Sequence, residues 1–198
     1  EDRAHLIFEL SGKGYEPKEV GEGDKKITIP HRLTVKLNKS LNEKATYYKL
    51  FKRMNYEGKF TSFIQMLGQA FLANVGHFEF PAKEAGGKPM VIANFRDDAG
   101  NLTIRPPRIE TVDDDGEVVV KPITVAPALS AQKCLIWDAK PEHLAKMWAS
   151  ITVPDADADK QFLQIEVKKA INFEGSPIQQ YLVSAGVDLG IPAAADDK

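Results

Sequence analysis

Residues 31–54 read HRLTVKLNKSLNEKATYYKLFKRM and pass from a hydrophobic period of two to one of about 3.6 residues. In the first part, Leu33, Val35 and Leu37 alternate with polar residues. This alternation predicts a strand with one buried face. Arg32 and Lys36 fall on the other face, so we expect the open side of the strand to be cationic.

A helix is expected soon after this strand. Ser40 and Glu43 have the spacing of a capping box, which satisfies backbone N–H groups at a helix start. Apolar residues then recur at helical spacing: Tyr47, Leu50, Phe51 and Met54. We therefore predict a helix from residue 41 to about residue 54.

The rest of the chain predicts further short strands, with helices gathered at the end. A hairpin turn is expected at Asp115-Gly116, where both residues tolerate positive φ. Strands are expected over residues 4–10, 71–80, 90–95, 102–105, 109–112, 118–125 and 132–137. Helices are expected over residues 62–67, from about 141 to 151 and over 163–171, with a strand as the alternative for the last.

This order of elements indicates an α+β or mainly β protein with one helix inserted between strands. We treat residues 1–190 as a single domain with C-terminal helices, and residues 191–198 as a flexible acidic tail. The chain begins without methionine and enters its first strand almost at once, which we interpret as a start within the fold.

The positive charge of the chain is concentrated in residues 25–59. That segment has a net charge of +8, whereas the whole chain has −2. Its cations are Lys25, Lys26, Arg32, Lys36, Lys39, Lys44, Lys49, Lys52, Arg53 and Lys59. Its aromatic residues are Tyr47, Tyr48, Phe51, Tyr56 and Phe60. Cations interleaved with aromatic rings suit a strand of phosphates that carries unpaired bases.

No motif in the sequence indicates catalysis. The four histidines and the single cysteine, Cys134, are too widely spaced for a zinc site. No phosphate-binding glycine loop, nucleophile elbow or kinase signature is present. We therefore expect a non-enzymatic protein without a cofactor or metal. No apolar run approaches the roughly 20 residues of a membrane helix, so we expect no membrane contact.

Part of the aromatic set is expected to be exposed. If Tyr47, Phe51 and Met54 face the core, Tyr48 lies about 100° away around the helix. Lys52 follows Tyr48 by four residues on the same outer face. The alternative is that the basic segment is an ordinary solvated surface with more lysine than usual.

Several segments of the chain resemble small proteins encoded in bacteriophage replication regions. These segments are residues 5–10 (HLIFEL), 29–37 (IPHRLTVKL), 66–75 (MLGQAFLANV) and 172–177 (NFEGSP), with a lysine-containing helix after the second. Members of that group are regarded as single-stranded DNA-binding proteins with an OB-like barrel, and they have a further strand before the equivalent of His5. The resemblance implies an OB-like, partly closed antiparallel β-barrel for this chain.

The resemblance supplies no contact residues, so we select them by charge and aromatic placement. The residues expected to bind phosphates are Arg32, Lys36, Lys49, Lys52, Arg53 and Lys59, extended by a second basic cluster at Arg96 and Arg105. The residues expected to stack on bases are Tyr48, Tyr56 and either Phe95 or Trp137, of which Trp137 has the more apolar, core-like neighbours.

The expected function is single-stranded DNA binding with little sequence preference, which would protect strands during phage replication or recombination in the host cytoplasm. The expected partners are single-stranded DNA, phage replication proteins that contact the acidic tail, and a second copy in a homodimer. An alternative is a virion or tail protein whose basic patch contacts an acidic subunit. A recombination mediator or nuclease accessory would share the DNA affinity.

Overall fold

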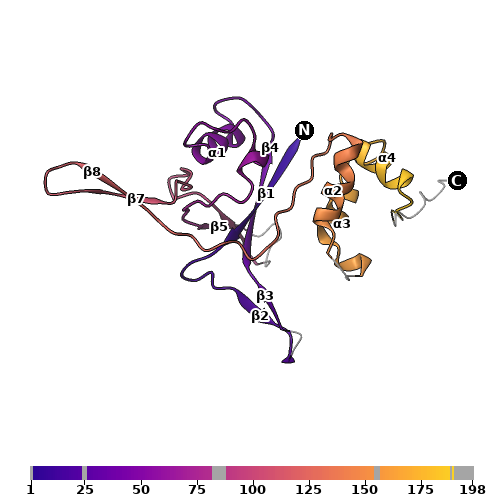
Figure 1. The fold of residues 1–198 in the computed structure, drawn as a ribbon, viewed down its shortest axis with the longest axis horizontal. Coiled ribbons are helices and arrows are strands. Elements are labelled where there is room, and N and C mark those ends of the chain that lie inside the picture. Colours follow the sequence, from indigo (N-terminus) through magenta and orange to yellow (C-terminus); the bar gives the residue numbers. More distant parts are fainter. Residues whose placement is uncertain (1, 24–25, 82–87, 154–156, 188, 190–198) are drawn as a thin grey trace. The chain divides into compact units, whose positions relative to one another are not determined.

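The computed structural model describes residues 2–23, 26–81, 88–153, 157–187 and 189 of the chain. It is a mixed α+β protein with helices and small antiparallel sheets (Figure 1), which confirms the predicted class. The chain divides into two compact units, residues 1–131 and residues 132–198. A single domain was predicted over residues 1–190. The structure instead has two units, each with its own hydrophobic cluster.

The first unit is built on one long pair of strands. Strand β1 (Arg3–Leu10) pairs antiparallel with β4 (His31–Asn38). Both segments were predicted as strands, and the structure adds their pairing. Leu33 lies opposite Phe8 in this register, and Arg32 lies opposite Glu9. Since successive side chains point to opposite faces of a strand, Leu33 and Leu37 share the buried face and Arg32 lies on the other.

Helix α1 (Thr46–Met54) starts five residues later than predicted. The expected capping box is wrong, because Ser40 and Asn42 form successive turns instead. The Ser40 hydroxyl accepts a bond from the Asn42 N–H (3.3 Å), and the Asn42 side-chain oxygen accepts one from the Lys44 N–H (2.9 Å). These side-chain bonds compete with a helix start. The helix begins after Ala45, which provides no side-chain cap.

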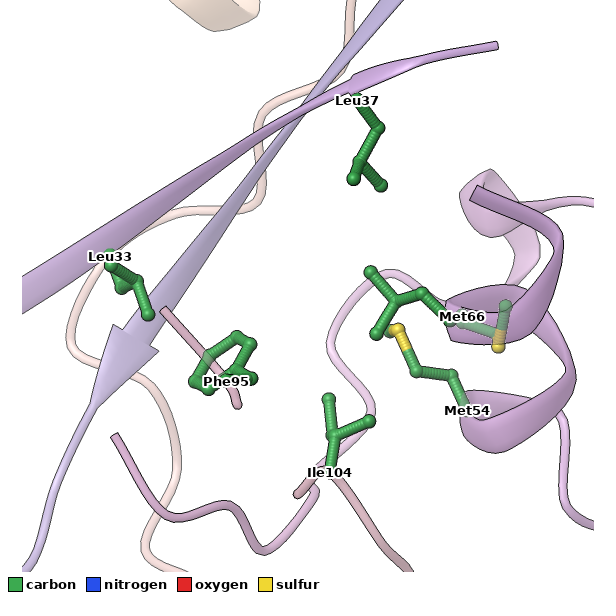
Figure 2. Close-up of a cluster of buried hydrophobic side chains, with 7 residues drawn as sticks. Leu33, Leu37, Met54, Met66, Phe95 and Ile104 are labelled. Carbon is green, nitrogen blue, oxygen red and sulfur yellow. The ribbon is translucent and has the colours of Figure 1, made fainter. Parts of the chain in front are cut away.

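Helix α1 packs on the buried face of β4. The cluster of buried residues consists of Leu33, Leu37, Leu50, Met54, Met66, Phe95 and Ile104 (Figure 2). Met66 belongs to the 3-10 helix η2 (Phe63–Met66), which is shorter than the helix predicted over residues 62–67. Ser62 is the N-cap of η2, and the Gln65 side chain completes a capping box there.

Three two-stranded hairpins complete the first unit. They are β2 (Lys18–Val20) with β3 (Ile27–Ile29), β5 (Gly76–Phe80) with β6 (Met90–Asn94), and β7 (Arg108–Val112) with β8 (Val118–Pro122). The β7–β8 hairpin turns at Asp115-Gly116 as predicted, through a five-residue turn. The strand predicted over residues 71–80 begins only at Gly76, and residues 102–105 form isolated bridges rather than a strand. Within the described residues, the four sheets do not close into a barrel.

The second unit is a small helical cluster. Its elements are α2 (Pro141–Ile151), the 3-10 helix η3 (Ala158–Lys160), α3 (Phe162–Lys168) and α4 (Pro177–Ser184). The helix predicted from about residue 141 to residue 151 is confirmed. For residues 163–171, α3 confirms a helix rather than the alternative strand over most of the segment. The strand predicted over residues 132–137 is wrong. The sequence analysis missed α4, although Ser176 caps it and Pro177 is its first residue. The tail expected at residues 191–198 lies outside the described residues.

The contact between α1 and β4 is expected to dominate the stability of the first unit. Leu50 is 1% exposed in the cluster, so Leu50→Ala should lower the free energy of unfolding by about 2–5 kcal/mol. Urea denaturation followed by circular dichroism measures this loss. Leu41→Ala is the matched control, because Leu41 is 79% exposed and the change should stay within about 0.5 kcal/mol. Equal losses in both variants would contradict this packing.

Candidate nucleic-acid interface

An open groove of about 380 Å³ lies between α1 and the turn that follows β6. Its helix side is formed by residues 46–53, and its other side by Arg96 and residues 100–102. Leu50 and Met54 hold the opposite face of α1 in the core. Helical spacing then places Lys49, Lys52 and Arg53 together on the exposed face. The lining residues are Glu43, Thr46, Tyr48, Lys49, Lys52, Arg53, Arg96, Gly100, Asn101 and Leu102.

The turn on the far side of the groove is held by its own hydrogen bonds. The Asn101 N–H donates to the Asp97 carboxylate (2.8 Å), and the Gly100 N–H donates to the Asp97 carbonyl (2.8 Å). Gly100 has φ +81°, which a residue with a side chain rarely adopts. The bond from the Asn101 backbone lowers the pKa of the Asp97 carboxyl, and the charge of Arg53 lowers it further. This wall of the groove is therefore built before any ligand binds.

Arg96 joins the two walls. Its Nη1 donates to the Gly100 carbonyl (2.6 Å) and its Nη2 donates to the Thr46 hydroxyl (2.9 Å). Thr46 is the first residue of α1, so a single guanidinium fixes the helix start to the turn. The sequence analysis expected Arg96 to bind phosphate, and the structure adds this positioning role.

The other cations of the groove differ from Arg96 in their bonding. Among the described residues, no carboxylate forms a salt bridge with Lys49, Lys52 or Arg53, although the charge of Arg53 acts on Asp97. Glu43 is the one acidic residue that lines the groove. The half-buried ring of Tyr48 lies beside these cations, as its helical spacing from Lys52 predicted. The groove therefore combines an excess of positive charge with one aromatic ring.

Two predicted cations lie on the other side of the β1–β4 pair. Arg32 and Lys36 alternate with the core residues, so they point away from the face that α1 covers. Arg32 donates from Nη2 to the Ser130 hydroxyl (2.8 Å). The strand and the helix of the basic segment thus do not share one surface, contrary to the expectation that its cations form one path.

Glu9 completes a clasp with Arg32 and the segment around Ser130. Its carboxylate accepts the backbone N–H groups of Leu129 (2.6 Å) and Ser130 (2.9 Å). Partial burial raises the pKa of the Glu9 carboxyl, but the Ser130 and Leu129 hydrogen bonds and the charge of Arg32 outweigh this, so the net pKa is lowered. Arg32 is therefore part of a structural contact that holds residues 129–130 on β1 and β4.

Two further predicted residues lie outside the groove. Tyr56 is 41% exposed and lines a separate, much smaller cavity with Phe60 and Phe71. Lys59 forms a salt bridge with Glu57 (2.7 Å), and the hydrogen bond from this pair raises the pKa of Lys59.

The remaining predicted residues have other positions. Phe95 is 3% exposed and packs edge-to-face on Phe8, with ring centroids 4.8 Å apart, so its expected stacking on a base is wrong. Arg105 is exposed, and its backbone pairs with Leu72 rather than lining the groove. Trp137 packs in the second unit against Phe173, in agreement with its apolar neighbours. Lys25 lies outside the described residues.

The far wall of the groove was not predicted, because nothing local in the sequence indicates that Gly100, Asn101 and Leu102 lie beside α1. Thr46 was not predicted either, because the helix expected over residues 41–54 encloses the residue that begins α1. Long-range packing of β6 and α1 on one core brings these residues together.

Comparisons with known proteins add nothing to this geometry. Neither the protein-family models, nor the curated proteins, nor the solved structures include a match to this chain. In the part of the chain that the structure describes, no group of three or more His, Cys, Asp or Glu residues could hold a metal ion. The same part has no helix that is long and apolar enough to cross a membrane.

The Glu9 clasp makes stability depend on pH. Because the pKa of Glu9 is lowered in the folded state, the clasp contributes above the ordinary value of 4.5 and is lost as the pH falls through the lowered value. Glu9→Gln should lower the free energy of unfolding by about 1 kcal/mol at pH 7, since the carboxylate is partly solvated. Urea denaturation at several pH values measures this. The difference should narrow below pH 4.5, and a constant difference would contradict the clasp.

Proposed function

We propose that this chain binds single-stranded nucleic acid, and specifically single-stranded DNA, without catalysing a reaction. The observation that carries the proposal is the groove in which Lys49, Lys52 and Arg53 form no salt bridge with any described residue and lie beside the ring of Tyr48. Positive charge attracts the phosphate backbone, and an aromatic ring accepts a base on its face. A duplex keeps its bases stacked inside and offers such a ring no free base.

The proposed binding mode assigns separate tasks to the basic and aromatic side chains of α1. Lys49, Lys52 and Arg53 neutralise successive phosphates, and Tyr48 stacks on one base. Because every base has a π-face, stacking does not depend on sequence. Among the residues that line the groove, Asn101 is the one with a side-chain amide that could hydrogen-bond to a base edge. Few groups of the groove are therefore placed to distinguish one base from another. Little sequence preference follows.

The biological setting of the proposal rests on the resemblance to phage replication proteins. We propose that the chain protects exposed strands during phage DNA replication or recombination in the host cytoplasm. The same resemblance supports an OB-like relationship, in which β1 and β4 would be two strands of the barrel. A contact of the acidic tail at residues 191–198 with replication proteins stays a prediction, as does a homodimer.

The cations of α1 should set both the affinity and its salt dependence. Lys52→Glu/Arg53→Glu should weaken binding to an oligo-dT of about 25 nucleotides by at least tenfold, and by a similar factor for other sequences. If two phosphate contacts are lost, the slope of log Kd against log salt concentration should fall by about 1.4. Fluorescence anisotropy over a salt series measures both quantities.

The matched control for this charge reversal lies in the second unit. Lys140→Glu/Lys146→Glu changes the net charge by the same amount at two exposed positions. It should leave the salt slope unchanged. If both double variants lose affinity equally, net charge rather than the groove accounts for binding, and if the wild type does not bind oligo-dT even at low salt, the proposed function is wrong.

The ring of Tyr48 should contribute to affinity through stacking. Tyr48→Ala should cost about 1–3 kcal/mol of binding free energy, measured by isothermal titration with the same oligonucleotide. Tyr48→Phe should retain most of the affinity, because the phenyl face still stacks. Tyr56→Ala is the control, since Tyr56 is exposed outside the groove. A larger loss for Tyr56→Ala than for Tyr48→Ala would place the stacking site elsewhere.

A further inference from the structure

The β7–β8 hairpin is a ribbon without a supporting layer. Its strands pair with each other from Arg108 opposite Pro122 to Val112 opposite Val118. No residue of either strand belongs to the hydrophobic clusters, and Figure 1 shows the hairpin leaving the rest of the first unit. Five residues per strand carry the turn about 15 Å beyond the base of the ribbon. A hairpin that packs on nothing is at best marginally stable in water, so a surface that supports it is expected.

Three exposed valines share one face of this ribbon with the Arg108–Glu110 ion pair. Val112 and Val118 are opposite each other, and Val120 is opposite Glu110, so the three valines share a face. They are 68%, 64% and 49% exposed, respectively. Such a face next to the end of a ribbon can bury apolar surface against a partner.

The end of the ribbon is strongly acidic. The turn from Asp113 to Glu117 has four carboxylates in five residues. Asp113 is used within the turn, where its carboxylate accepts the N–H groups of Asp115 (3.1 Å) and Glu117 (2.8 Å). Asp114, Asp115 and Glu117 are exposed, and no described cation forms a salt bridge with them. This charge repels phosphate and is complementary to a cationic surface.

The groove beside α1 provides the opposite charge. It contains Lys49, Lys52 and Arg53, which form no salt bridge with a described residue, and its rim has the half-buried side chains of Tyr48 and Leu102 for apolar contact. We propose that the β7–β8 hairpin is a self-association arm, whose acidic turn docks in the cationic groove of a second copy of this chain. Each copy then offers one arm and one groove. Two copies that exchange arms form a closed dimer, whereas a one-way head-to-tail contact forms a ring or an open chain.

The arm and nucleic acid use the same groove, so they compete. Single-stranded DNA presents more negative charge than the turn and adds a base for Tyr48, and it should displace the arm. This displacement rests on the proposed function, whereas the docking of the arm does not. The arm would keep the groove covered in free protein and release it when a strand is present.

A charge exchange between two variants tests the docking. Wild-type protein should self-associate reversibly in sedimentation velocity at about 50 mM salt, with an association constant at least about tenfold lower at 500 mM, because salt screens charges. Asp114→Lys/Asp115→Lys and Lys49→Glu/Lys52→Glu should each be monomeric alone. Mixed together, they should associate, since the basic turn of one fits the acidic groove of the other. Asp114→Asn/Asp115→Asn provides a milder variant, and circular dichroism verifies that all variants fold.

Three outcomes would contradict the proposed docking of the arm. These are a monomeric wild type at low salt, association of either charge-reversed variant alone, or a mixture of the two charge-reversed variants that does not associate. Anisotropy with an oligo-dT of about 25 nucleotides separates this proposal from the proposed function. If Asp114→Asn/Asp115→Asn binds the oligonucleotide more tightly than the wild type, competition is supported. If the charge exchange succeeds but no protein binds the oligonucleotide, the proposed function fails and the arm stands. If the wild type binds the oligonucleotide but is strictly monomeric, the proposed arm fails and the proposed function stands.

Discussion

The packing of α1 on the inner face of β4 is the contact on which the groove depends. Leu50 and Met54 meet Leu33 and Leu37 in the core, and this fixes which side of the helix faces solvent. With its apolar side held in the core, α1 has its lysines and arginine on the exposed side. The same core includes Phe95, the residue before Arg96, so the far wall of the groove is anchored in the same cluster.

The electrostatics of the first unit show two uses of the same residue types. Arg96 and Arg32 make hydrogen bonds that hold backbone segments in place, at the helix start and at Ser130 respectively. Lys49, Lys52 and Arg53 form no salt bridge with a carboxylate among the described residues. A cation whose donors are already bonded within the fold offers less to a ligand than one that is still solvated. The proposed binding surface is therefore smaller than the basic segment from which the sequence analysis started.

Local patterns predicted the elements whose residue spacing or turn residues are regular in the sequence. Alternation identified β4, turn residues identified the β7–β8 hairpin, and helical spacing identified α1 and α2. The start of α1 was predicted wrongly because Ser40 and Glu43 match a capping box in sequence, while Asn42 forms a competing turn. Phe95 was selected as a stacking candidate by charge and aromatic placement, although its ring is buried in the core. In both cases a local pattern allowed two structures, and packing selected one.

The sequence by itself determined the charge asymmetry, the α+β class and the pairing of Tyr48 with Lys52 on one helical face, because these follow from composition and from the period of a helix. Only the tertiary structure decided which basic residues share a surface. Strand alternation places Arg32 and Lys36 on the face of β4 remote from α1, whereas residues 96–102 reach the groove from about fifty positions further along the chain. Local periodicity cannot encode such a distant contact, which depends on how the elements bury one common core.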